Sequence, residues 1–538
     1  MQGHLTSTVM DVARIGSLAG SQTAGRATFG LDFQGSLRDT VTLGQVTVSA
    51  LSYRGIPLGP GTATFKVEKK AVDVDLIFRD GTHRLLVSVG PPGDRSVKGE
   101  LTLSDADLSL VAQAGGIETL RAYRARGTGR IRFGGPARAP AFGSGEADFT
   151  NLRLQLAGEN WETQGAVRAT WSGPTMSIRQ LRLRSGDREF EVRGTVSEEG
   201  QADLTVAGEV PLLLLTEDLP FVHPTQGLAN VNLRMRGVRG ARTFDGTLEI
   251  QKGQLTVSEL PMDFREVQAA LVLQGNNTQI REWRARLADG NFNATGTVGM
   301  NGGRWDLRLT FQEEKGRAEQ FLRGLYGGKG EVTGQLSLGG LLTSAGEEKA
   351  DFWRNLGGDL KLDMQEGQIG RYTVTAKILS LLNMGHLMNP KGPDLTAEGM
   401  PYQRLTADIK ISNGIARTDD LVLDSRAMKV SAVGAINLAE ETVDLTVAVR
   451  PFQNVDRVLT AIPLAGWLLG GKEKSILVAY YRVTGSLRDP QVTAVPLRSV
   501  GRNLFGIFRN LLEIPETITG PYEDLPPQAI KPEEGETR

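Results

Sequence analysis

Hydrophobic and polar side chains alternate with a period of two along most of this chain. Val443, Leu445 and Val447 fall on one side of the alternation, and the residues between them are polar or small. The same pattern recurs over 231–236 and 359–364. A period of two with one apolar side is typical of a β-sheet that is wet on one face. The sequence therefore predicts a mostly β fold of antiparallel strands.

A motif of alternating apolar and polar residues between glycines recurs roughly every hundred residues, which indicates an internal repeat. It begins at Gly25, Gly127, Gly227 and Gly330. The segments expected from this repeat and from the composition at each end are the tail of an upstream repeat over 1–24, β repeats over 25–126, 127–226 and 227–329, a C-terminal β region with helical inserts over 330–497, an amphipathic helix over 498–514 and a disordered tail over 515–538.

Short turns join the expected strands. Asp80-Gly81 and Asp289-Gly290 are dipeptides typical of β-hairpins, in which we expect the glycine to take the positive φ. Paired carboxylates such as Glu313-Glu314 also stand beside turn residues. We interpret these pairs as solvated turns.

Long helices that could cover the apolar side of the sheet are scarce in the sequence. A long sheet with one apolar face must curl on itself or leave an apolar groove. We expect an elongated, repetitive antiparallel sheet curled into such a groove, taco-like or solenoid-like, with short helical inserts. The alternative is a set of stacked sandwiches that are dry inside. The residues predicted to line the groove are Val231, Leu233, Met235, Leu360, Leu362, Val443, Leu445 and Val447.

Three segments depart from the strand pattern. Apolar residues over 376–388 have helical spacing, and a helix that packs on the core is favoured there. The uncharged segment 458–471 is too short to span a bilayer and fits a re-entrant or interfacial element, or a buried plug. The basic amphipathic segment 498–514 would lie on a membrane or cap the end of the sheet. Residues of these last two segments are predicted to contact a membrane or cap the end of the sheet. They are Trp467, Leu468, Leu504, Phe505, Phe508 and Leu511.

The composition supports many short strands. The 538 residues include 66 glycines, 6% aromatic residues and no cysteine, and the net charge is −1. Such a chain forms no disulfide or thiolate metal site, and its net charge does not attract nucleic acid. No apolar run reaches the length of about 18 residues that spans a bilayer, and the start of the chain has no secretory signal. We expect a membrane anchor to lie on an upstream segment that this chain lacks.

The sequence contains no recognisable catalytic constellation. The four histidines His4, His83, His223 and His386 are too scattered for a zinc site or a Ser-His-Asp triad. The segment 466–472 approaches a phosphate-binding loop but is followed by Glu473 where Ser or Thr is needed. We therefore expect no enzyme and no cofactor. The alternative among enzymes is a carbohydrate-active β enzyme, which would need two carboxylates that face one cleft.

A series of short sequence motifs in the C-terminal portion carries a family resemblance. They stand in order at 358–362, 411–416, 433–438, 463–466 and 481–485. With these motifs the sequence resembles the AsmA-like family of bacterial envelope proteins, in particular its YhdP- and TamB-like members. The resemblance implies an inner-membrane-anchored protein of the periplasm with an elongated β groove that passes phospholipids between the inner and outer membranes.

The expected function follows from the groove and the resemblance together. Phospholipid acyl chains would be the cargo, with a membrane at one or both ends and inner- or outer-membrane proteins as further partners. No nucleic acid is expected. The alternative is a TamB-like assembly factor for outer-membrane or secreted β proteins, which would template strands at a sheet edge.

Overall fold

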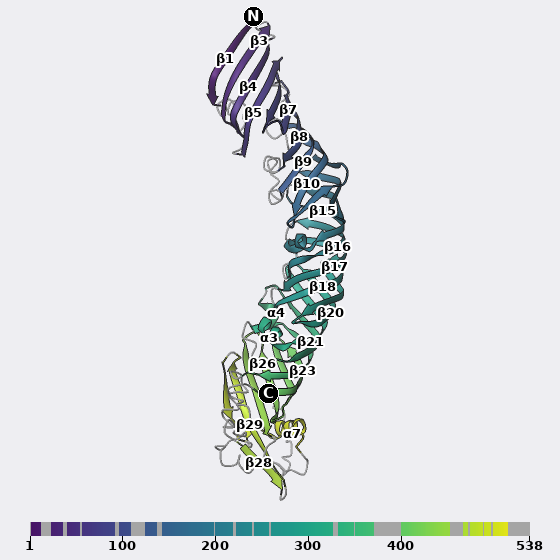
Figure 1. Ribbon diagram of the computed structural model, residues 1–538, viewed down its shortest axis with the longest axis vertical. Helices are drawn as coiled ribbons and strands as arrows, with labels where there is room; N and C mark the ends of the chain where they lie inside the picture. The colour runs from purple at the N-terminus through teal and green to yellow at the C-terminus, as the bar shows by residue number, and fades with distance from the viewer. Residues whose placement is uncertain are drawn as a thin grey trace, which may run out of the picture. The chain divides into compact units, whose positions relative to one another are not determined.

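The structure is a computed structural model of the chain (Figure 1). It describes residues 2–11, 23–35, 40–53, 56–91, 96–108, 124–136, 143–197, 199–218, 222–238, 241–257, 260–326, 332–348, 350–370, 400–451, 466–471, 474–487, 489–496 and 499–514.

The chain divides into two compact units. Unit 1 comprises Met1–Pro220, Gln226–Gln251 and Val272–Gly275, and unit 2 comprises the remainder. The strands that lie in unit 1 or share residues with it are β1 (Gln2–Asp11), β2 (Thr23–Ala24), β3 (Arg26–Gly35), β4 (Thr40–Tyr53), β5 (Ile56–Glu68), β6 (Ala71–Phe78), β7 (His83–Val89), β8 (Ser96–Asp107), β9 (Arg124–Pro136), β10 (Ser144–Leu156), β11 (Glu159–Thr163), β12 (Val167–Ser172), β13 (Thr175–Ser185), β14 (Arg188–Ser197), β15 (Ala202–Pro211), β16 (Val222–Val238), β17 (Ala241–Val257) and β18 (Leu260–Gly275). A helical turn, η3 (Leu212–Asp218), follows β15.

Unit 2 continues the same strand pattern with short helices between strands. Its strands are β19 (Asn277–Leu287), β20 (Gly290–Asn301), β21 (Arg304–Arg317), β22 (Gln335–Gly346), β23 (Gly357–Ile369), β24 (Met400–Ser412), β25 (Ile415–Asp424), β26 (Met428–Asn437), β27 (Thr442–Pro451), β28 (Gly466–Gly471), β29 (Lys474–Ser486) and β30 (Asp489–Ala494). The helices are α3 (Ala318–Tyr326), α4 (Asp351–Arg354) and α7 (Arg502–Leu511).

Within each unit the strands pair antiparallel, mostly with their neighbours in sequence. Examples are β4 with β5 and β5 with β6 in unit 1, and β20 with β21 and β21 with β22 in unit 2. Short connections favour this arrangement because antiparallel strands need only a tight turn between them. The predicted mostly β, antiparallel architecture with short helices is confirmed.

The register keeps residues of one kind on one side of each sheet. In unit 1, Val46 lies opposite Phe29 on β3 and Ala63 on β5, and Leu85 lies opposite Leu76 and Leu101 on its two neighbours. Side chains of directly opposite residues point to the same face. We call this side the apolar face of its unit and the opposite side the polar face.

The turn between β19 and β20 differs from the expected hairpin chemistry. Ala288 and Asp289 take the positive φ values there, 47° and 63°, and Gly290 does not. A Cβ atom added at Gly290 would collide with a carboxylate oxygen of Glu313. The expectation that Gly290 supplies the positive φ is therefore wrong, and the residue is a glycine because β21 fills the space beside it. At Gly81, with φ 81°, the expectation is confirmed.

Several sequence predictions fall wholly or partly outside the described residues. The helix expected over 376–388, the first part of the apolar segment 458–471 and the tail 515–538 belong to this group. The last part of the apolar segment, Gly466–Gly471, is strand β28 and pairs with β29.

Candidate functional site

The apolar face of unit 1 is the first candidate site. Leu85 and Val87 on β7 are half-buried, and so are Leu31 on β3 and Phe65 on β5. The next residue after Leu85, Leu86, points to the polar face and is 38% exposed. Unit 1 therefore presents a surface of aliphatic and aromatic side chains that its own strands only partly cover.

The apolar face of unit 2 is more completely buried. Its cluster of buried side chains runs from Leu336 on β22 to Tyr481 and Val483 on β29, and the last two are 0% exposed. Helix α3 packs on this face through Ala318 and Phe321. A second cluster joins α4 to the same face, where the Ser344 hydroxyl donates to the carbonyl of Phe352 at 2.9 Å.

The residues predicted to line a groove all lie on apolar faces. Val231, Leu233 and Met235 on β16 face the same side as their partners Gly208, Val206 and Leu204 in unit 1. The members in unit 2 pair in the same way across β22 to β24 and β26 to β29, and they are Leu360, Leu362, Val443, Leu445 and Val447. Whether lipid lies against these side chains stays a prediction.

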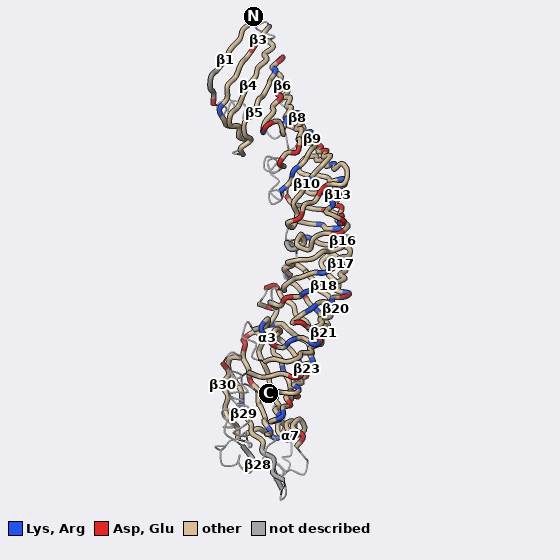
Figure 2. Tube along the Cα trace, viewed as in Figure 1, with Lys and Arg blue, Asp and Glu red and all other residues tan. Residues whose placement is uncertain are grey.

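The polar faces carry cross-strand ion pairs. Examples are Arg168 with Asp148 at 2.7 Å and Arg234 with Asp203 at 2.8 Å. Figure 2 shows basic and acidic positions interspersed along the strands of both units. The hydrogen bond from Arg234 lowers the pKa of Asp203. Because the charges largely neutralise one another, these faces suit contact with water better than binding of a polyanion.

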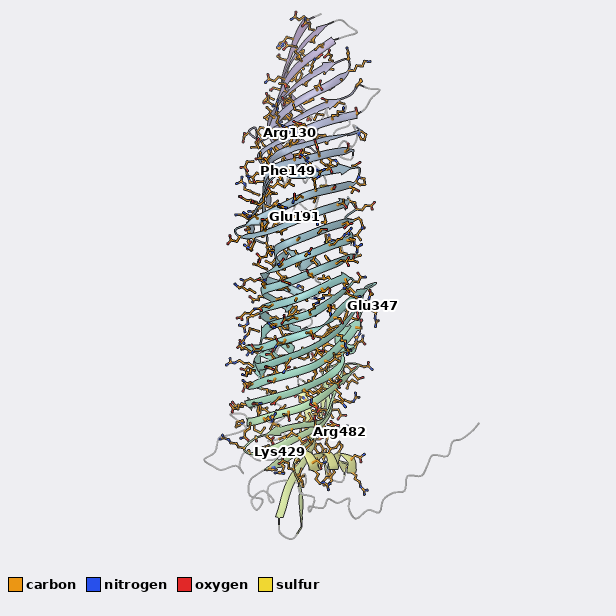
Figure 3. All side chains as sticks on the ribbon, turned by 90° about the vertical axis from the view of Figure 1, so that its right-hand side faces the viewer. Arg130, Phe149, Glu191, Glu347, Lys429 and Arg482 are labelled. Atoms are coloured by element: carbon orange, nitrogen blue, oxygen red, sulfur yellow. The ribbon has the colours of Figure 1, made fainter. Side chains whose placement is uncertain are left out.

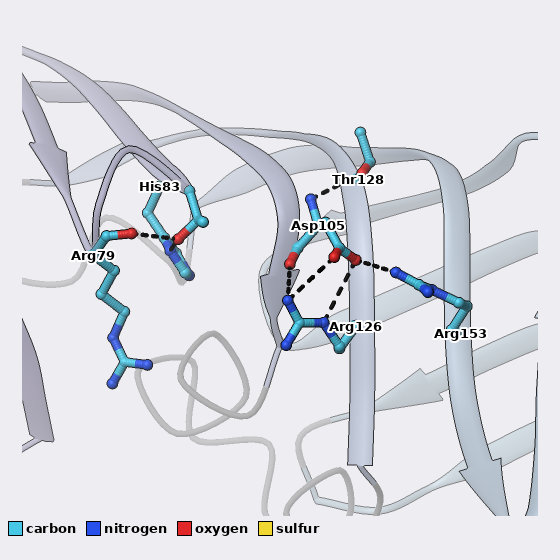
Figure 4. Close-up of polar contacts among 7 residues, drawn as sticks. Arg79, His83, Asp105, Arg126, Thr128 and Arg153 are labelled. Atoms are coloured by element: carbon cyan, nitrogen blue, oxygen red, sulfur yellow. Dashed lines mark hydrogen bonds and ion pairs between the residues drawn. The ribbon is translucent and has the colours of Figure 1, made fainter.

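A β-bulge in β8 shows how the strands bend. The register shifts between Leu103 and Ala106, and Asp105 between them takes φ 49°. Its carboxylate accepts hydrogen bonds from Arg126, at 3.2 Å, and from Arg153 (Figure 4). Hydrogen bonds from these two guanidinium groups lower the pKa of Asp105, and the bond from Arg126 has the larger effect. Bulges bend a strand and increase its twist, so this ion-paired bulge stabilises local curvature of the sheet.

Glu313 is an acidic residue on the apolar face of unit 2. It lies opposite Phe292 on β20 and Leu338 on β22, it is 0% exposed, and neither carboxylate oxygen has a hydrogen-bond partner among the described residues. Burial raises its pKa to about 8, against a smaller opposing effect of Arg286.

The prediction that Glu313 belongs to a solvated turn is therefore wrong. The alternation of Trp305, Leu307, Leu309 and Phe311 places residue 313 on the apolar side, and this signal was available in the sequence.

Other polar groups on the apolar faces are sealed by neighbouring side chains. In unit 1, His83 is 2% exposed and stacks on Phe78 with ring centroids 4.9 Å apart. Burial lowers the pKa of His83, so the imidazole is neutral at pH 7. In unit 2, burial raises the pKa of Tyr402 to about 12, and its hydroxyl donates to the carbonyl of Thr333 at 2.7 Å. Each of these groups is buried in the core of its own unit.

Helix α7 covers the polar side of the last strands of unit 2. Phe508 is 0% exposed and meets Tyr480 edge to face, with ring centroids 5.7 Å apart. The Lys429 ammonium lies beside α7 (Figure 3) and pairs with Glu513 at 2.7 Å. The guanidinium of Arg450 donates to the carbonyls of the residues that follow the helix. In this arrangement α7 packs on the sheet.

The residues predicted to contact a membrane or cap the sheet have different surroundings. All four α7 residues of this group contribute to its packing side to different degrees: Phe505 and Phe508 are buried against the sheet, while Leu504 and Leu511 are half-buried. Trp467 lies opposite Val478 in the pairing of β28 with β29, and Leu468 is the next residue. Membrane contact by this group stays a prediction.

No metal-binding cluster of histidine and acidic side chains occurs in the part of the chain that the structure describes. Within the same part, no helix is long and apolar enough to cross a membrane. A hollow of about 610 Å³ lies over unit 1 and is lined mainly by polar-face residues such as Asp32, Lys66 and Asp73. The half-buried apolar face of unit 1 is therefore the feature that most needs a partner.

The fold and its apolar faces define the class first: a repetitive antiparallel β protein with short helices. Residues 317–492, from the end of β21 into β30, match the family model described as YhdP protein, and this part of the chain belongs to that family. A comparison with curated proteins found no match. Membership in this family points to lipid transport in the envelope.

Proposed function

We propose that this protein is a bridge-like lipid transport protein that conducts phospholipids between the inner and outer membranes. Acyl chains would lie on the apolar faces while headgroups stay in water, so the transfer needs neither a cofactor nor a nucleotide. The periplasm is the proposed location, with a membrane at one or both ends of the path. Membrane contact through β28 and α7, and membrane proteins as partners, belong to the same proposal.

The half-buried apolar face of unit 1 carries this proposal. Each methylene removed from water contributes about 0.8 kcal/mol. A bilayer and an apolar protein face both keep a chain out of water, so a chain that moves between them changes its free energy little. Such a surface suits sliding better than tight capture. An uncovered apolar face of this kind also needs a partner to be stable in water.

Two adjacent leucines provide a matched test. Leu85 points to the apolar face and Leu86 to the polar face of the same strand. We expect Leu85→Asn to lower the amount of phospholipid that co-purifies with the chain, because one amide on the face removes a stretch of apolar contact. Leu86→Asn should retain the lipid of the wild type. Native mass spectrometry with lipid extraction measures both, and circular dichroism confirms that both variants fold.

Two outcomes contradict the proposal. Equal lipid in the two variants would show that the bound lipid does not lie on the apolar face. A folded wild type that carries no lipid would favour the other reading of the fold, an assembly factor for β proteins that pairs with strands at a sheet edge.

A further inference from the structure

Aromatic rings on the apolar face of unit 1 lie over glycines of the neighbouring strand. In each case the ring and the glycine are directly opposite in the antiparallel register. The pairs are Gly3 with Phe33, Gly44 with Phe65, Gly99 with Phe133, Gly129 with Phe149 and Gly145 with Trp171. The arrangement therefore recurs from β1 to β12.

The ring occupies the space that a side chain at the glycine would need. A Cβ atom added at Gly99 would lie 2.6 Å and 2.7 Å from the two Cε atoms of Phe133, and closer still to Cζ. At Gly3 the corresponding distances to both Cε atoms of Phe33 are 2.7 Å. Real Cβ atoms essentially never approach other atoms so closely. Any residue other than glycine would displace the ring.

Backbone conformation does not explain these glycines. Gly3, Gly44 and Gly99 are absent from the positions with a positive φ, whereas turn glycines such as Gly81 have one. At Gly3 and Gly99 every atom that an added Cβ would meet most closely belongs to the opposite ring. The ring, rather than the chain path, therefore requires glycine at these two positions.

The tips of the Phe33, Phe65 and Phe133 rings are held close to the sheet. The Cζ atom of Phe133 lies where the Cβ of a neighbouring residue would be, so the ring leans across the next strand instead of standing up from its own. Phe33, Phe65 and Phe133 are half-buried in this position. Leaning rings give a low apolar floor, and upright rings would rise from that floor by several ångströms.

We propose that these glycine–aromatic pairs keep the apolar face of unit 1 low and thereby set how much acyl chain the face can take. This inference rests on the proposed function, because it concerns the same face and the same cargo. A low floor admits a long, flexible hydrocarbon chain that runs across several strands. A row of upright rings would divide the same face into short compartments. The glycines are thus positioning residues that act through the rings.

The test replaces glycines on the two faces of neighbouring strands, β3 with β4 and β8 with β9. Gly99→Ala and Gly44→Ala place a methyl group under a ring. Gly30→Ala and Gly134→Ala place it on the polar side, where an added Cβ would have only ordinary contacts, 3.9 Å to His4 at Gly30 and 3.6 Å to the carbonyl of Val97 at Gly134. We expect the first two variants to lose most of the co-purifying phospholipid and the second two to retain it. Native mass spectrometry measures lipid, and thermal unfolding shows whether each variant folds.

A double variant separates a raised ring from a weakened strand. In Gly99→Ala/Phe133→Leu the ring that alanine would lift is absent. Lipid should return toward the wild-type amount if the raised ring blocks the chain. If Gly99→Ala only weakens the sheet, the second substitution will not restore lipid and will lower the unfolding temperature further. This comparison still decides the question if Gly99→Ala alone folds poorly.

The possible failures are distinguishable. Wild-type amounts of lipid in folded Gly99→Ala and Gly44→Ala would overturn this inference and leave the proposed function standing. Equal loss of lipid in the polar-side controls would also overturn it. A wild type without lipid would overturn the proposed function, and the inference with it.

Discussion

Replacing Glu313 by glutamine should remove a large part of the pH dependence of local stability in unit 2. Glu313 is fully buried between Phe292 and Leu338 on the neighbouring strands. Its carboxylate oxygens have no partner among the described residues. The carboxyl is therefore neutral in the folded protein at pH 7, and ionising it requires water to enter or the strands to separate. Glutamine keeps the shape of the side chain and cannot ionise.

The two pKa values of Glu313 give the size of the effect. In the folded protein burial raises the pKa to about 8, whereas the ordinary value is 4.5. Between these values the folded state binds more protons than the unfolded state, so the free energy of unfolding falls as the pH rises. The cost is absent below the lower pKa and complete above the higher one. Each pH unit is worth about 1.4 kcal/mol, which sets a limit of about 5 kcal/mol. Water entry reduces this, and we expect about 2–3 kcal/mol.

Hydrogen exchange at β20 to β22 measures the local free energy of opening, which a two-unit chain does not yield from global unfolding. Wild type, Glu313→Gln and Glu314→Gln should be compared at several pH values from 5 to 9, a range that the two pKa values define. Glu314 is exposed and is the matched control. Wild type and the control should lose protection as the pH rises, and Glu313→Gln should lose much less. A Glu313→Gln variant with the same pH dependence as wild type would refute the reasoning.

Two further predictions concern packing and surface charge. Phe508→Ala should free α7 from the sheet at a cost of about 3–5 kcal/mol, because a fully buried ring is lost. Faster hydrogen exchange in α7 would show this, with the exposed Asn510→Ala as control, and unchanged exchange would contradict it. Asp203→Asn should leave the unfolding temperature almost unchanged, since its pair with Arg234 is exposed to solvent. A large drop would show that the polar-face ion pairs hold the sheet together.

The strand faces were predictable from the sequence because alternation maps directly onto them. Val231 and Leu233 reach the apolar side of β16 as the period of two requires. Glu313 was predicted wrongly because two adjacent carboxylates are typical of a solvated turn, whereas the alternation from Trp305 to Phe311 places residue 313 on the apolar side. Gly290 was misassigned because a turn dipeptide does not reveal what lies across the sheet, and here the neighbour is the Glu313 side chain. Such long-range contacts depend on register, which a single strand does not encode.

The position of α7 shows a related limit. Its amphipathic pattern predicts a helix with one buried side but does not say what that side covers. The helix covers β27 and β29. There Ala448, Val478 and Tyr480 are apolar residues on the side of the sheet that carries polar residues elsewhere. An apolar run that breaks alternation is typical of a strand buried on both faces. The run over 477–481 therefore carried the signal for a cover on the second face.

Burial separates positions that hold the fold from positions that could carry cargo. Val447 on β27 is 4% exposed and its neighbour Ala448, on the opposite face, is 0% exposed, so this strand is dry on both sides. An acyl chain gains nothing by covering side chains that are already out of water. Leu85 in unit 1 is half-buried beside an exposed Leu86, and a chain laid on its face would remove apolar surface from water. The capacity for lipid is therefore to be sought first on the half-buried face of unit 1, where leaning rings over glycine leave room for it.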